Sequence, residues 1–264
     1  MNSQRGFHAL PIVIVIIVLG VIGLAGWRVL GSNGQKETGE SDILSQDELD
    51  SLPDISYFET NKSDRFLVDY EVAKQGHPFL GKNSPMPHSG GHVHFQDTYK
   101  TWPQGGTAPE NYPPIYAVAD GVVNRIDKNH PVADHERYGI SIAIAKDGRD
   151  SWNFDYSIEP FVKEPSPGFY EDFMLVAVGD YVKKGQIIGY MYLPDFATGS
   201  HIHFHLRKNS NFYAPAIFTD EVVESARATW GEFGIQQGTE IPVCMGWKLA
   251  AEENPFTSEA VECL

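Results

Sequence analysis

Gly199-Ser200-His201-Ile202-His203-Phe204-His205-Leu206 is the stretch that decides the fold. Its histidines alternate with Ile, Phe and Leu, and a period of two is typical of a β-strand, so the three imidazoles are predicted to share one face. Neutral imidazole is a common zinc ligand, and ligands on one strand have a fixed separation before metal binds. The stretch therefore predicts a metal-binding strand, although His-x-His alone also occurs on the polar face of half-exposed strands.

Composition excludes several classes of protein. The chain has 264 residues, and its hydrophobic content of 42% is enough for a core. A net charge of −15 and a pI near 5.0 exclude a nucleic-acid binder and a protein that docks on anionic lipid through basic patches. Its two cysteines, Cys244 and Cys263, form no Cys-x-x-Cys motif. They are expected either to form one disulfide, in an oxidising compartment, or to remain free thiols.

The N-terminal part predicts a membrane anchor. After a short segment, 1–8, residues 9–30 form an apolar run long enough to cross a hydrocarbon core of about 30 Å. No Ala-x-Ala cleavage site follows it, which favours an uncleaved signal anchor. The expected location is the cell membrane, in a single pass, with the C-terminal domain outside the cytoplasm. Residues 31–55 are rich in Gly, Ser and acidic side chains and predict a flexible stalk.

Residues 56–218 carry the signals of a mostly antiparallel β domain. Pro114–Val123 reads as a hairpin with an Asp-Gly turn. Residues 138–145 alternate in polarity, and 151–158 look like their partner strand. In 176–189, Gly-Asp and Lys-Gly punctuate short strands. The remainder, 219–264, is expected to be a helical extension whose helix is capped by Asp220 and presents one apolar stripe, formed by Val222, Ala226, Trp230 and Phe233.

Three blocks in this order resemble the lysostaphin and LytM-type zinc endopeptidases: Pro114–Val123, Val178–Tyr190 and Gly199–Phe204. The likeness spans roughly residues 85–208 and implies the antiparallel β-sheet of that metallopeptidase fold. The middle block alone also resembles biotinyl and lipoyl carrier domains. A carrier needs its modifiable lysine at a hairpin tip, however, and Lys183 and Lys184 lie within the strand-turn block.

The resemblance implies a zinc site. In the family, His-x-Gly-x-Asp supplies two ligands and the second histidine of His-x-His supplies the third. His88-Ser-Gly-Gly-His92 matches the first motif, with histidine where the family has aspartate, and His203 matches the third ligand. Three histidines leave the fourth tetrahedral position open to water. An alternative register takes His94 and Asp97 as the first pair.

The resemblance also implies catalytic residues. His201, the first histidine of His-x-His, would accept a proton from water or orient it. A further histidine of the family, in a Tyr-Ala-His-Leu motif, aligns with Tyr156, whose phenol could donate to an oxyanion. His205, where the family has glutamate, would support the site from behind the ligands. Strand parity puts Asp155 opposite Tyr156, which excludes Asp155 from this prediction.

Two functions follow as expectations. One is a membrane-anchored zinc endopeptidase that hydrolyses peptide cross-links of peptidoglycan, or another extracellular peptide, by metal-activated water. The other is a catalytically degenerate domain on the same fold that binds cell-wall peptides or regulates a partner hydrolase. The remaining histidines are expected to be surface residues; they are His8, His77, His130 and His135.

Overall fold

The computed structural model describes residues 44–81, 90–95, 108–194, 199–230, 247–249, 251, 254–256 and 261–263. The predicted anchor, His88, Asp97, Phe233 and Cys244 lie outside these residues. Within the described part of the chain, no helix has the length and apolar character needed to cross a membrane.

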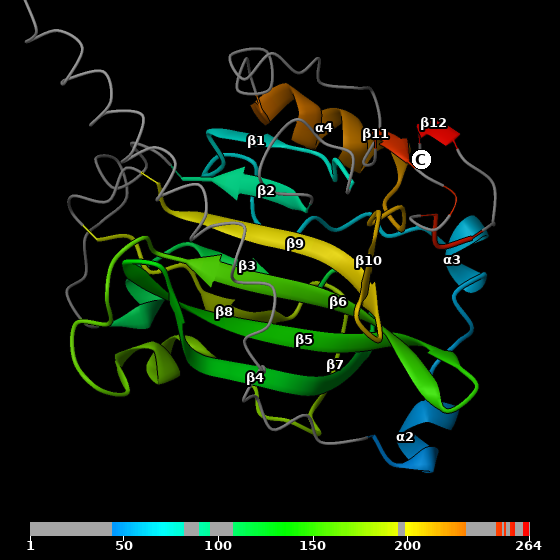
Figure 1. Cartoon of the computed structure of the whole chain (residues 1–264), viewed down its shortest axis with the longest axis horizontal. Coiled ribbons are helices and arrows are strands. Elements are labelled where there is room, and N and C mark those ends of the chain that lie inside the picture. Colours follow the sequence, from blue (N-terminus) through cyan, green and yellow to red (C-terminus); the bar gives the residue numbers. More distant parts are fainter. Residues whose placement is uncertain are drawn as a thin grey trace, which may run out of the picture. The chain divides into compact units, whose positions relative to one another are not determined.

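One large antiparallel sheet dominates the fold (Figure 1). Its three long central strands, β4, β5 and β6, follow one another through short turns, and β9 pairs with β6. The mostly antiparallel β class predicted from the sequence is therefore confirmed. The strand order is β1 (Gln75–His77), β2 (Gly91–His94), β9 (His201–Lys208), β6 (Asp150–Glu159), β5 (His135–Asp147), β4 (Gly121–Val132) and β7 (Tyr181–Val182), with β10 (Asn211–Tyr213) paired to β9.

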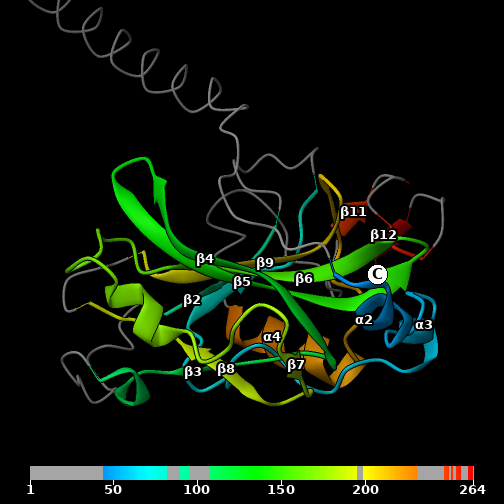
Figure 2. The ribbon, with the colours of Figure 1, turned by 90° about the horizontal axis from the view of Figure 1, so that it is seen from below.

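Smaller elements flank this sheet. Figure 2 shows β3, β8 and α4 on the same side of the large sheet. β3 pairs with β8, and β11 pairs with β12, each antiparallel. Their bounds are β3 (Pro114–Tyr116), β8 (Ile187–Tyr190), β11 (Trp247–Leu249), β12 (Val261–Cys263), α2 (Gln46–Asp50), α3 (Tyr57–Thr60), α4 (Asp220–Trp230) and the 3-10 helices η2 (Pro109–Asn111) and η3 (Phe169–Phe173).

The two faces of β6 and β9 differ in polarity. One face is apolar and lies in the core: Phe154 stacks on Phe204 with ring centroids 6.1 Å apart, and both are 0% exposed. The opposite face carries the histidines of β9, because successive side chains of a strand point to opposite sides. The alternation in 199–206 thus predicted both faces correctly.

Residues 44–55 differ from the predicted flexible stalk. Ser45 and Glu48 form a capping box that starts α2. Leu49 and Leu52 are buried, and Leu52 packs with Val122 and Ala143 of the large sheet. This segment is therefore part of the β domain, because two leucines in a polar sequence are enough to dock one helical turn.

The predicted hairpin at Pro114–Val123 is wrong. Pro114–Tyr116 and Gly121–Val132 are both strands, but they pair with β8 and with β5 and β7 instead of with each other. Gly121 serves a close approach, since a Cβ there would lie 2.4 Å from the carbonyl oxygen of Ala143. An Asp-Gly pair thus marks the passage of the chain from one sheet to the other.

Helix α4 packs against β1, as Figure 1 shows. Trp230 is fully buried, and a Cβ on Gly76 would lie 2.4 Å from its ring. Thr219 caps the helix in place of Asp220, because Thr219 Oγ1 accepts from the backbone N–H of Val222 at 3.4 Å. The C-terminal helix is therefore a support for the edge strand β1.

Candidate metal centre

Strand register gathers histidines from three strands into two rows on the outer face of the sheet. His77 of β1 pairs with His92 of β2, and His92 pairs with His203 of β9. In the next row, His94 pairs with His201. Side chains directly opposite on antiparallel strands are neighbours, so the register alone places these imidazoles side by side.

Ring contacts confirm this arrangement. The His92 centroid lies 4.4 Å from that of His77, 4.6 Å from that of His203 and 4.9 Å from that of His201. His94 lies 4.9 Å from His201. His77 and His92 are each 2% exposed, so the centre of the cluster is buried.

His77 was expected at the surface, and the structure corrects this expectation. Its Nδ1 lies 2.8 Å from the carbonyl oxygen of Pro78, which can only accept a hydrogen bond, so Nδ1 donates. Its Nε2 then accepts from Nδ1 of His92 at 2.6 Å. The sequence shows that the segment forming β1 contains a histidine. It does not show the register that pairs β1 with β2.

His92 is held neutral. Its burial, and then the neighbouring imidazoles, lower the pKa of His92 well below the ordinary value for histidine; these neighbours are His203, His77, His201 and His94. A neutral imidazole is the form that binds a metal. His92 therefore has the protonation state that a metal ligand needs.

His201 has a defined orientation. Its Nδ1 donates to the carbonyl oxygen of Gly199 at 2.7 Å, which leaves Nε2 as the basic nitrogen. Nε2 lies 3.6 Å from Oε2 of Glu159, the residue directly opposite on β6. The same oxygen lies 3.3 Å from Nε2 of His135, which is 7% exposed and stacks on Phe161. Glu159 and His135 were missed by sequence reasoning, and His135 was wrongly expected at the surface.

Gly90 gives the ring of His203 its place. A Cβ on Gly90 would lie 2.0 Å from Nε2 of His203. Any side chain at position 90 would therefore displace the His203 ring. This glycine is the Gly of the His-x-Gly-x-Asp-like motif. The structure thus explains why that position, two residues before His92, requires glycine.

His205 lies at the end of the histidine face. Its Nε2 is 3.3 Å from Oδ2 of Asp155, which is opposite on β6. Asp155 also binds Arg207, with Nε to Oδ2 at 2.5 Å. Asp155 thus lies on the same face of the sheet as the histidines. The sequence-based prediction excluded it because that prediction placed Tyr156 on this face instead.

Tyr156 lies on the opposite face. It pairs with Phe204, is 1% exposed, and its hydroxyl accepts from the backbone N–H of Val118 at 2.9 Å. Burial raises the pKa of Tyr156 far above its usual range. The structure therefore does not bring Tyr156 to the histidines, and the oxyanion role expected of it does not fit this geometry.

The described histidines do not by themselves complete a metal site. Among the described residues, no group of three His, Cys, Asp or Glu side chains has an arrangement that could hold a metal ion. His92 and His203 are described, whereas His88 lies outside the described ranges. The alternative pair is divided in the same way, with His94 described and Asp97 outside.

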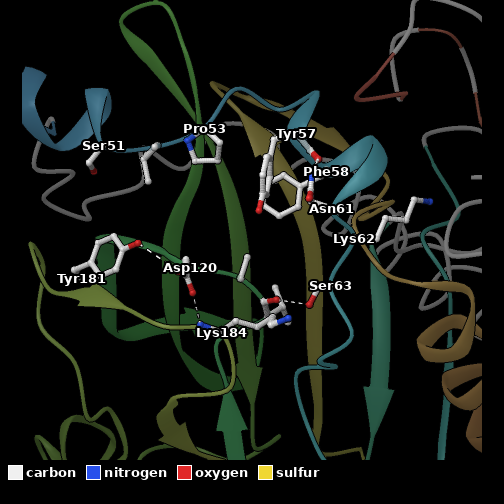
Figure 3. Close-up of a pocket in the computed structure, with 13 residues that line it drawn as sticks. Ser51, Pro53, Tyr57, Phe58, Asn61, Lys62, Ser63, Asp120, Tyr181 and Lys184 are labelled. Carbon is white, nitrogen blue, oxygen red and sulfur yellow. Dashed lines mark hydrogen bonds between the residues drawn. The ribbon is translucent and has the colours of Figure 1, made fainter.

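A pocket of about 550 Å³ lies elsewhere, between α3 and the start of β4 (Figure 3). The carboxylate of Asp120 accepts hydrogen bonds from the backbone N–H of Lys184 at 2.8 Å and from Nζ of Lys183 at 2.9 Å. Lys184 in turn binds Asp64. The residues that line the pocket include no histidine or cysteine, and these charged groups have partners within the fold, so the histidine face is the better candidate site.

Part of the chain is similar to known peptidases. Residues 170–215 match the model of peptidase family M23. Three solved structures share 18–20% identity with this chain. They are a zinc containing peptidase from Vibrio cholerae (TM-score 0.37; 58% of this chain and 39% of that chain), a point mutant of the catalytic domain of the prophage-encoded M23 protein EnpA from Enterococcus faecalis (0.35; 58% and 94%), and the catalytic domain of lysostaphin from Staphylococcus simulans (0.30; 61% and 92%).

No curated protein matches the chain. The M23 match contains most of η3 and all of β7, β8, β9 and β10, and hence His201 and His203; His92 precedes it. The resemblance to the lysostaphin and LytM-type endopeptidases is thereby confirmed over the residues that the family model matches.

Proposed function

We propose that this protein is a zinc endopeptidase that hydrolyses peptide cross-links of peptidoglycan. The observation that carries the proposal is the cross-strand pair of His92 and His203, two buried or half-buried imidazoles with ring centroids 4.6 Å apart. The family match over 170–215 supports the class of reaction. The degenerate, peptide-binding alternative is tested by the same experiment.

The ligand set in this proposal is His88, His92 and His203. Register favours it over His94 and Asp97, because His92 is the partner of His203 whereas His94 is the partner of His201. The steric fit of Gly90 against His203 supports the same motif alignment. When bound, zinc would supply Lewis-acid activation of water and of the peptide carbonyl.

His201 is the proposed general base. Its Nδ1–H is already used by the carbonyl of Gly199, so Nε2 is the nitrogen that takes a proton. The imidazolium that then forms is stabilised by the carboxylate of Glu159, 3.6 Å from Nε2. Since Tyr156 is a core residue, the proposal gives it no role in the reaction.

The proposed setting is the outer side of a membrane. The apolar run at 9–30 supports an anchor there, and the C-terminal domain would then face the cell wall. Peptide cross-links of peptidoglycan are the substrate in this setting. The zinc ion and the peptide are the proposed binding partners, together with the membrane itself.

Hydrolysis of a cross-linked wall peptide by the full chain, purified in detergent, tests the proposal. Wild type is expected to cleave the peptide, and His203→Ala and His201→Ala are expected to lose at least about 100-fold in kcat, as is usual for an essential acid–base group. His130→Ala is the matched control, since His130 lies on β4, three strands from β9.

Each outcome decides between functions. Cleavage by wild type and by His130→Ala, but not by the other two variants, supports the endopeptidase. Zinc bound without any cleavage supports the degenerate alternative. Cleavage that persists in His203→Ala contradicts the proposed site.

A further inference from the structure

We propose that His77 is a positioning residue: its hydrogen bond with His92 fixes the tautomer of His92, so that Nε2 of His92 carries the lone pair that a metal ligand needs. The inference rests on the proposed function, because it concerns a residue assigned there as a ligand. Its first test, however, needs no metal.

The direction of two hydrogen bonds determines the tautomer. The carbonyl of Pro78 has no proton to give, so His77 must donate through Nδ1, at 2.8 Å. A neutral His77 then has only a lone pair at Nε2. His92 must therefore donate through its own Nδ1, at 2.6 Å. The proton of a neutral His92 is thus on Nδ1, and Nε2 is the basic nitrogen.

The position of the proton on His92 matters for metal binding. A histidine ligand binds through one ring nitrogen and usually donates the other N–H to a nearby acceptor, which fixes the ring and makes it more basic. The acceptor here is an imidazole whose own proton is held by a backbone carbonyl. The hydrogen bonds that join His92, His77 and the carbonyl of Pro78 therefore hold a neutral His92 with its lone pair on Nε2.

The packing of β1 keeps His77 in this place. His77 is the register partner of His92 and is 2% exposed, so water does not compete for its Nε2. On the other side of the strand, Trp230 of α4 fits against Gly76. The helix thus fixes the strand from which His77 projects, as the adjacent positions of α4 and β1 in Figure 1 show.

The first test is heteronuclear NMR of the imidazole rings in the metal-free full chain. It is made at about pH 8, where imidazoles with an ordinary pKa near 6.5 are neutral. The expected result is that His92 carries its proton on Nδ1. A His92 protonated on Nε2 overturns the inference, and this measurement needs no variant.

Two variants at one position form the second test. Glutamine at 77 can accept from His92 through its side-chain oxygen, whereas leucine fills a similar volume and accepts nothing. His77→Leu is expected to give a mixture of His92 tautomers and to lower zinc affinity about 10- to 100-fold, the usual cost of losing such a partner. His77→Gln is expected to keep both the tautomer and the affinity close to those of wild type.

The results separate this inference from the proposed function. Equal tautomers and equal zinc affinity in wild type and His77→Leu overturn the positioning role even if the enzyme cleaves peptide. A wild type that binds no zinc overturns the proposed function, while loss of the Nδ1–H tautomer in His77→Leu would still establish the role of His77.

Discussion

Oε2 of Glu159 lies 3.6 Å from Nε2 of His201, across the pair of strands β6 and β9. Both residues are largely buried: Glu159 is 9% exposed and His201 is 7% exposed. A carboxylate in this place favours the protonated form of the imidazole. The contact therefore suits a histidine that gains a proton during the reaction, and it provides the first prediction.

Glu159→Gln is expected to lower kcat about 10- to 100-fold, as outer partners of a site usually do, and to leave zinc content unchanged. The reason is that the neutral amide no longer stabilises the imidazolium of His201. Steady-state kinetics on the cross-linked peptide measure the effect. The control is Glu171→Gln, which changes an exposed glutamate of η3. Unchanged kcat in Glu159→Gln contradicts the assignment of His201 as base.

Tyr156→Phe is expected to reduce stability and not catalysis. The change removes the acceptor of the buried Val118 N–H and should lower the free energy of unfolding by about 1–3 kcal/mol. Denaturant unfolding measures this, with Tyr57→Phe as control because Tyr57 is 49% exposed. A loss of kcat at unchanged stability would instead restore the oxyanion role that the sequence motif indicated.

Gly90→Ala and Gly91→Ala are expected to act on opposite faces of the sheet, one just before β2 and the other at its first residue. The alanine at 90 displaces the ring of His203 and should lower zinc affinity by at least about tenfold. The alanine at 91 meets the ring of Phe204 in the core and should cost about 1–3 kcal/mol of stability. Zinc titration and denaturant unfolding of both variants provide the comparison. Wild-type zinc affinity in Gly90→Ala would contradict the proposed ligand geometry.

Asp155 should make stability depend on acid pH. Burial, the largest influence, raises its pKa, but the hydrogen bonds and charges of His205 and Arg207 outweigh it, so the pKa lies well below the ordinary range. The unfolded chain has a pKa near 3.9 for this group. Because the folded pKa is the lower one, its stabilisation is complete above about pH 5 and is lost as pH falls.

Asp155→Asn tests this pH dependence. It leaves Arg207 without its buried partner and should lower the free energy of unfolding by about 3 kcal/mol at neutral pH. The difference from wild type should shrink as pH falls below about 4. Asp150→Asn, at the exposed start of β6, is the control. Wild-type and Asp155→Asn stability curves that remain parallel through this range would show that the carboxylate does not carry the effect.

Local pattern predicted much of the fold. The alternation in 199–206 predicted both faces of β9, and Gly179 and Gly185 have the positive φ expected of the turns around β7. The Asp-Gly pair wrongly predicted a hairpin turn, because Gly121 does not have a positive φ. The glycine is needed instead because the carbonyl oxygen of Ala143 lies too close for a side chain. The capping box at Ser45 was readable in the sequence and would have corrected the predicted stalk.

The site was less predictable because it depends on register. His77 and His92 are 15 residues apart and meet only because β1 pairs with β2 at one register, with α4 packed behind β1. A shift of one residue in β6 exchanges Tyr156 for Ser157 and Glu159 on the histidine face. The sequence shows which residues of a strand share a face. Tertiary packing decides which of the two faces lies toward the site.

Zinc content of the purified full chain, compared with His92→Ala, His203→Ala and His94→Ala, tests the central claim most directly. Stoichiometric zinc in wild type and in His94→Ala, lost in the other two variants, is the result that this account predicts. Zinc retained in His92→Ala and lost in His94→Ala would move the site to His94 and Asp97. Wild-type protein without zinc would contradict the claim of a metal centre altogether.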